Sequence, residues 1–209
     1  IMETLFLNLI WMTYNLCLGV IAVTAGWLAI KKPHFWFRIV FGFVWFLFMP
    51  NTLYMLTDIA HLTRQWNIVG DEIKILLILQ YGLFIFLAIA LFVWGLYPLE
   101  KFLIKVLTKR KYVILAMLVI MNFVIGFGVA MGRVERTTSW EVVINTGKVI
   151  NDSINVATSP SSMMLAAFFG IVGNVIYFSL KTEVVKYGSY VAKKVLRIRG
   201  SDYYENFGG

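Results

Sequence analysis

The segment from Phe48 to Leu62, FMPNTLYMLTDIAHL, contains the residues best suited to chemistry. On an α-helix, residues three or four positions apart lie on the same face. The polar members of this segment at that spacing are Asn51, Tyr54, Asp58 and His61. The chain around them is strongly apolar, and an ionisable side chain near the centre of a membrane helix costs about 2.5 kcal/mol or more. This polar stripe therefore needs a partner, water or a function, and it is the principal candidate site.

Asp58 and His61 are three residues apart, which lets both side chains bind one metal ion or share one proton. A zinc site would also need Glu135 or Glu141, because the only other histidine, His34, is expected at the opposite side of the membrane. As an acid/base pair, Asp58 would orient the His61 imidazole and raise its basicity. No convincing nucleophile accompanies this pair, since Ser139 is explained more economically as part of a helix start. We predict no metal and no cofactor, and catalysis by His61 remains the alternative.

A second polar segment, residues 132–159, reads GRVERTTSWEVVINTGKVINDSINVATS. Arg133 and Arg136 lie one turn apart and could form a fork for a phosphate or carboxylate. They could equally pair with Asp58, because charges at a membrane boundary are expected to pair with one another. Thr138 and Glu141 fit a capping box at the start of a short helix. The predicted ligand-binding residues are Asn51, Tyr54, Asp58, His61, Arg133, Arg136 and Glu141.

The composition indicates how these residues must be held. The 209 residues are 60% hydrophobic, 16% aromatic and only 14% charged, which is typical of a polytopic membrane protein. With spans of about 20 residues each, the sequence predicts an all-α bundle of five transmembrane helices. Their expected ranges are 5–30, 39–57, 75–99, 112–132 and 160–180. Residues 133–159 are expected to include an interfacial helix, with Trp140, Val143, Ile144, Ile150 and Ile154 toward the bilayer.

The distribution of basic residues predicts the orientation. Segments 31–38, 101–111 and 181–199 contain 3, 5 and 6 of the 19 lysines and arginines. Because the basic side of a membrane protein faces the cytoplasm, the N-terminus should lie outside and the C-terminus inside. Residues 1–180 would form the bundle. Residues 181–209 would form a cytoplasmic tail, either a basic amphipathic helix on an anionic leaflet or a solvated helix.

Two blocks of the sequence, PNTLYMLTDIAHL and GFGVAMGRVERTTSWEVV, resemble the signature blocks of the bacterial domain-of-unknown-function 1361 family. That family's pattern runs roughly Pro-Asn-x-x-Tyr-x-x-Thr-Asp-x-x-His-Leu and, later, Gly-Arg-x-x-Arg-x-x-Ser-Trp-Asp. The matching positions are Pro50, Asn51, Tyr54, Thr57, Asp58, His61, Gly132, Arg133, Arg136, Ser139 and Trp140. Glu141 stands where the pattern usually has Asp. The resemblance supplies positions and implies no reaction.

The expected function is that of a non-catalytic protein of the bacterial plasma membrane. Its expected partners are membrane lipids, with an anionic lipid, an envelope precursor or a membrane protein bound at an extracytoplasmic pocket. The net charge of +8 does not indicate nucleic acid, because the basic residues are not predicted to share one groove. The alternatives are a membrane-embedded hydrolase or transferase using His61 and Asp58 and, less favoured, a small transporter. A transporter would need matching ionisable residues in the inner halves of the spans.

Overall fold

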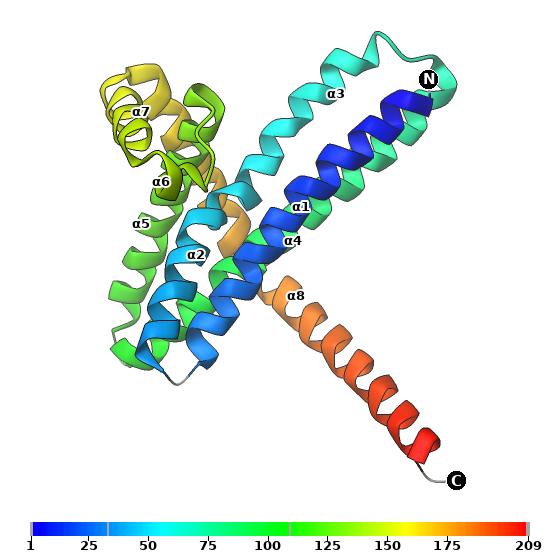
Figure 1. The fold of residues 1–209 in the computed structure, drawn as a ribbon, viewed down its shortest axis with the longest axis vertical. Helices are drawn as coiled ribbons and strands as arrows, with labels where there is room; N and C mark the ends of the chain where they lie inside the picture. Colours follow the sequence, from blue (N-terminus) through cyan, green and yellow to red (C-terminus); the bar gives the residue numbers. More distant parts are fainter. Residues whose placement is uncertain (1, 33, 109, 208–209) are drawn as a thin grey trace.

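The computed structural model describes residues 2–32, 34–108 and 110–207, with side chains for 4–32, 34–108 and 110–186. Every regular element in these ranges is a helix (Figure 1). The elements are α1 (Met2–Lys31), α2 (Phe35–Tyr54), the 3₁₀ turn η1 (Met55–Asp58), α3 (Ile59–Trp66), α4 (Asp71–Leu107), α5 (Lys111–Ala130), the π turn η2 (Met131–Glu135), α6 (Glu141–Ile144), α7 (Thr146–Thr158) and α8 (Pro160–Phe207).

Five helical segments in the described part are long and apolar enough to cross a membrane, which confirms the predicted number. They are Thr4–Lys31, Phe35–Trp66, Asp71–Leu107, Lys111–Glu135 and Pro160–Lys186. Each contains the range expected from the sequence. Large apolar side chains cover their outer faces, among them Phe6, Phe37, Leu79, Phe86 and Ile120. So much exposed apolar surface suits hydrocarbon rather than water.

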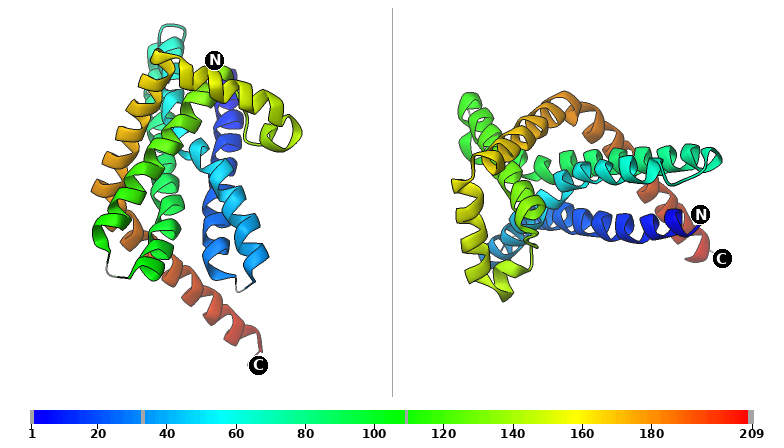
Figure 2. Two further views of the ribbon diagram at one scale, coloured as in Figure 1. Left: turned by 90° about the vertical axis from the view of Figure 1, so that its left-hand side faces the viewer. Right: turned by 90° about the horizontal axis from the view of Figure 1, so that it is seen from above.

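The helices run up and down between two ends of the bundle (Figures 1 and 2). One end, called here the α7 end, carries the start of α1, the α3–α4 connection, α6 and α7. The other, called the basic end, carries the α1–α2 and α4–α5 connections. Helix α7 lies across its end of the bundle, and Ile150 and Ile154 are exposed on it. A helix at this place, with exposed isoleucines four residues apart, matches the predicted interfacial helix.

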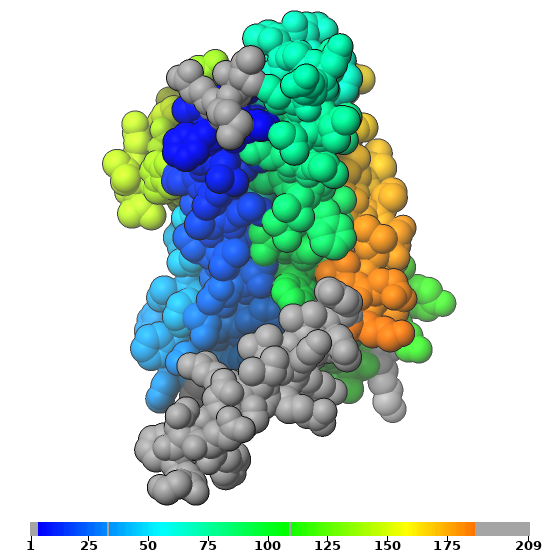
Figure 3. Space-filling model, turned by 90° about the vertical axis from the view of Figure 1, so that its right-hand side faces the viewer, coloured from blue at the N-terminus to red at the C-terminus, as the bar shows by residue number. Residues whose placement is uncertain are grey.

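Helix α4 is the central element. On the face shown in Figure 3 it lies between α1 and α8, and it also contacts α2 and α5. The main core contains Leu53, Phe92, Leu96, Val129 and Tyr177, all fully or almost fully buried. These residues come from α2, α4, α5 and α8, so the core holds together the elements that carry both polar segments.

Glycines let α5 and α8 approach closely. A Cβ added at Gly126 would lie 2.4 Å from the Ala166 carbonyl oxygen and 2.6 Å from the Gly170 nitrogen. The buried Asn122 donates to Asn174 at 2.9 Å across the same interface. Gly128 packs against Pro50 of α2 in a similar way. Small residues at helix interfaces are a common means of close packing between membrane helices.

Helix α8 continues without a break past residue 181 to Phe207, and its C-terminal part projects away from the bundle (Figure 1). Side chains after residue 186 lie outside those described. The amphipathic character of residues 181–209 and their cytoplasmic location therefore both stay predictions.

The orientation can be tested by cysteine labelling. In a Cys17→Ala background, we expect Gly147→Cys at the α7 end to react with an impermeant thiol reagent in intact cells. Lys105→Cys at the basic end should react only after permeabilisation, because the positive-inside rule predicts that this end faces the cytoplasm. Both native residues are exposed, so access is not limited by packing. The reverse pattern would show that the orientation is inverted.

Candidate functional site

A cavity of about 650 Å³ opens at the α7 end, between α1, the α2–α3 region and the segment that follows α5. Five of the seven predicted ligand-binding residues line it. These are Asn51, Tyr54, His61, Arg133 and Arg136. The other lining residues were not among the predicted ligands; they are Tyr14, Asn15, Leu18, Arg64, Gly128, Gly132, Thr137, Thr138, Ser139 and Trp140.

Irregular turns flank the cavity on both sides. The 3₁₀ turn η1 interrupts the helix of the first signature block, and the π turn η2 ends the helix of the second. Arg136 follows η2 in the left-handed conformation, with φ 56°. That conformation costs roughly 1–2 kcal/mol for a residue with a side chain. Such turns and strained residues are frequent at functional sites.

The turn η1 explains why Asp58 does not line the cavity. A 3₁₀ turn advances 120° per residue instead of 100°, so the polar stripe does not stay on one face. Asp58 is 4% exposed, and Asn15 Nδ2 donates to its Oδ2 at 3.1 Å. The predicted direct contact of Asp58 with His61, Arg133 or Arg136 is wrong, because no hydrogen bond or ion pair joins them among the described residues. Asn15 of α1 thus reaches across to the polar stripe.

Three arginines give the cavity its charge. Arg64, Arg133 and Arg136 line it, and no carboxylate does. In the described part of the chain, none of the three guanidinium groups donates a hydrogen bond or forms an ion pair. The interaction of Arg133 with Asp58 is electrostatic, without direct contact. Arg64 was missed, although its position three residues after His61 continues the polar stripe.

The two signature blocks meet at the floor of the cavity. Asn51 Nδ2 donates to Ser139 Oγ at 2.9 Å, and Ser139 Oγ donates to the Leu47 carbonyl at 2.8 Å. Leu47 lies in the helical turn before Pro50, so this hydrogen bond ties the segment after η2 to α2. Ser139 is therefore neither a free nucleophile nor the cap of α6, whose N-cap residue is Trp140.

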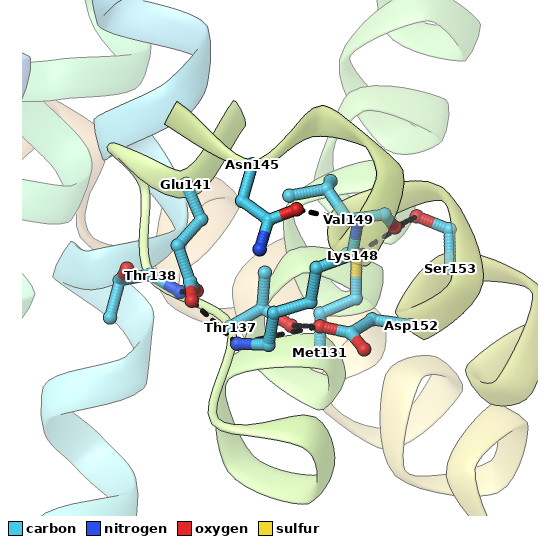
Figure 4. A network of polar contacts seen from close by, with 9 residues as sticks. All are labelled: Met131, Thr137, Thr138, Glu141, Asn145, Lys148, Val149, Asp152 and Ser153. Atoms are coloured by element: carbon cyan, nitrogen blue, oxygen red, sulfur yellow. Dashed lines mark hydrogen bonds and ion pairs between the residues drawn. The ribbon is translucent and has the colours of Figure 1, made fainter. Parts of the chain in front are cut away.

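The segment after η2 is clamped by a polar network (Figure 4). Glu141 accepts from the Thr138 backbone N–H and from Lys148 Nζ, each at 2.6 Å, which confirms the backbone half of the predicted capping box. The buried Asp152 accepts from Thr137 Oγ1 at 2.6 Å. The hydrogen bond from Lys148 lowers the pKa of Glu141 to about 2, and the same bond raises the pKa of Lys148.

Glu141 is absent from the residues that line the cavity, and its carboxylate faces Lys148. We infer that Glu141 holds the segment after η2 in place, so that Thr137 and Thr138 line the cavity. Lys148 also forms an ion pair with Asp152 in the same polar network, with 3.9 Å between Lys148 Nζ and Asp152 Oδ2. Their spacing of four residues on α7 was the available signal for this pair.

One side of the cavity is apolar and aromatic. Leu18 and the rings of Tyr14 and Trp140 line it, with the two ring centroids 6.5 Å apart. The His61 imidazole rests against the Trp11 indole, at 5.5 Å between centroids. The lining of the cavity thus combines cationic side chains with apolar and aromatic ones.

No group of three or more His, Cys, Asp or Glu side chains in the described residues is arranged to hold a metal ion. No hydrogen bond joins Asp58 and His61, and the Glu141 carboxylate is hydrogen-bonded to Lys148 and to the Thr138 backbone. The donors considered for zinc are therefore not gathered at one point.

A protein-family model matches most of the chain. The model described as "Protein of unknown function (DUF1361)" matches residues 14–176, which is well over half of the chain and includes both signature blocks. The chain therefore belongs to this family, as its motifs indicate. Neither a curated protein nor a solved structure matches the chain.

Proposed function

We propose that this member of the DUF1361 family binds the anionic head group of an amphiphile in the cavity at the α7 end, on the extracytoplasmic face of a bacterial plasma membrane. The head group would be a phosphate or carboxylate of a lipid or a lipid-linked envelope precursor. The observation that carries the proposal is a cavity of about 650 Å³ with three unpaired arginines and no carboxylate on its wall.

Unpaired cations beside hydrocarbon favour an anionic ligand. Charged side chains at membrane boundaries normally pair with one another, but Asp58 is buried behind the wall and already accepts from Asn15. Guanidinium groups present several hydrogen-bond donors in a geometry that suits phosphate and carboxylate oxygens. An anion in the cavity would supply the partners that Arg64, Arg133 and Arg136 lack.

The apolar wall favours an amphiphile over a small inorganic anion. Tyr14, Leu18 and Trp140 offer a surface for a hydrocarbon segment next to the cationic wall. Aromatic side chains at the membrane–water interface contact both environments well. A lipid-like molecule could place its head group at the arginines while its chain remains in the bilayer.

Binding is supported better than catalysis. A histidine acting as general base needs an orienting partner and reach to the proton it removes. Asp58, the expected partner, hydrogen-bonds to Asn15, and His61 packs against Trp11. Ser139, the hydroxyl considered as a nucleophile, donates to the Leu47 carbonyl and accepts from Asn51.

Isothermal titration calorimetry tests the proposal by measuring the affinity of the purified protein, in dodecyl maltoside, for dodecyl phosphate. We expect Arg133→Ala to weaken binding about tenfold to hundredfold, because a charge-assisted hydrogen bond contributes about 1.5–3 kcal/mol. The matched control is Arg110→Ala, an exposed arginine at the basic end, which should leave the affinity unchanged. Equal affinity for the wild type and Arg133→Ala would refute the proposal.

The variant His61→Gln separates binding from catalysis. It keeps size and hydrogen bonding but cannot transfer a proton at neutral pH, so we expect dodecyl phosphate binding and complementation of a deletion strain to persist. A loss of function of about a hundredfold or more with binding retained would instead identify His61 as a general base. Membrane abundance of each variant is measured in parallel.

A further inference from the structure

Two further cavities lie at the basic end of the bundle, the end opposite the proposed binding cavity. The first is an apolar groove of about 490 Å³ between α1, α2 and α4, whose lining includes Gly26, Gly42, Trp45 and Pro98. The second is a basic pocket of about 480 Å³ lined by Lys31, Lys32, Arg38, Lys101 and Lys105. Ile30, Arg38 and Phe102 line both, so the two cavities are adjoining parts of one depression.

The basic pocket is not neutralised by the protein. In the described part of the chain, none of its five cations lies within 4.0 Å of a carboxylate. Glu100, which precedes Lys101 on α4, is buried and accepts from Tyr177 at 2.5 Å and from Lys181 at 2.7 Å. Its charge is therefore directed to α8 and away from the pocket.

Several of these cations rest on aromatic rings. Lys101 Nζ lies 5.1 Å from the ring centres of both Trp27 and Tyr97, and the Arg38 guanidinium lies 5.5 Å from that of Phe102. A cation–π contact holds the cation in place but leaves its N–H donors free for an anion. The cations are thus oriented beside the mouth of the groove.

We infer that this depression binds an anionic glycerophospholipid, with the phosphate in the basic pocket and an acyl chain in the apolar groove. Basic pockets between membrane helices on the cytoplasmic side are suited to anionic lipid head groups. The positive-inside rule alone requires cations at this end but not their convergence on an apolar groove. Because the basic pocket adjoins an apolar groove, the depression suits a phospholipid better than a soluble anion, which has no apolar chain to bury in the groove.

Lipid retention in detergent, measured by native mass spectrometry, tests the inference. The full-length protein is titrated with dioleoyl phosphatidylglycerol, and dioleoyl phosphatidylcholine serves as the chain-matched neutral lipid. We expect a preference for phosphatidylglycerol that falls about tenfold or more in Arg38→Gln/Lys101→Gln. Arg110→Gln, at the same end but outside the pocket, should keep the preference. The double variant should lower the preference by the same factor in an Arg133→Ala background, which separates this site from the proposed function.

The groove is tested separately with Gly42→Leu. Gly42 lines the groove and a Cβ added there meets nothing within 4 Å, so a larger side chain can enter the groove without a clash at its Cβ. We expect reduced retention of phosphatidylglycerol, whereas Gly82→Leu, equally open but outside the groove, should have no effect. The inference is overturned if both lipids are retained equally, if Arg110→Gln acts as strongly as the double variant, if Gly42→Leu retains lipid normally, or if glycerol 3-phosphate competes as well as the lipid.

Discussion

Gly126→Ala is expected to destabilise the bundle strongly, by about 3 kcal/mol. The new Cβ would lie 2.4 Å and 2.6 Å from backbone atoms of Ala166 and Gly170, and backbone atoms cannot rotate out of the way as a side chain can. Helices α5 and α8 would have to separate, which would also stretch the Asn122–Asn174 hydrogen bond. The midpoint of unfolding in mixed dodecyl maltoside and SDS micelles measures the effect.

Gly82→Ala is the matched control for this prediction. Gly82 also lies within a membrane-spanning helix, α4, but an added Cβ meets nothing within 4 Å. Alanine has the higher helix propensity, so this variant should be at least as stable as the wild type. Equal midpoints for Gly126→Ala and Gly82→Ala would contradict the close approach of α5 and α8.

Asn15→Leu is expected to destabilise the protein by about 3 kcal/mol, because it leaves the buried Asp58 carboxylate without its hydrogen-bond donor. The loss should be largely reversed in Asn15→Leu/Asp58→Leu, where two apolar side chains of similar size replace the polar pair. The same unfolding midpoint in mixed micelles reports both variants. A double-mutant cycle then gives the coupling energy between the two positions.

Thr13→Leu provides the control for a leucine on α1. Thr13 is exposed, and its replacement should change stability by less than about 0.5 kcal/mol. If the double variant were as unstable as Asn15→Leu alone, Asn15 would stabilise the bundle by some means other than Asp58. The assignment of Asp58 as a buried, amide-bound carboxylate would then fail.

The spans could be predicted from the sequence because their signal is local. A helix in hydrocarbon satisfies its own backbone hydrogen bonds, so about 20 consecutive apolar residues are sufficient to identify it. All five predicted ranges lie within the observed helices. The hydrogen bond from the Thr138 backbone N–H to the Glu141 carboxylate could be predicted for the same reason, since its donor and acceptor are only three residues apart.

The site could be predicted only in part. Asn51, Tyr54 and His61, which were selected for their helical spacing, all line the cavity. Asp58 does not line it, because η1 is a 3₁₀ turn whereas the predicted stripe assumed an uninterrupted α-helix. Because both signature blocks were predicted at the same side of the membrane, they could be expected to lie near each other. Their actual contact, through Asn51 and Ser139, depends on how α2 packs against the segment after α5.

The sequence by itself determined the helical class, the number of spans and the segregation of basic residues, because each depends on hydropathy or charge along a short stretch of chain. Only the tertiary structure decided which polar groups meet. It left Arg64, Arg133 and Arg136 unpaired around one cavity, and it brought Lys31, Lys32 and Arg38 to the same pocket as Lys101 and Lys105. These groupings join residues far apart in the chain, and close helix packing, set by side-chain shape and by glycines such as Gly126, fixes them.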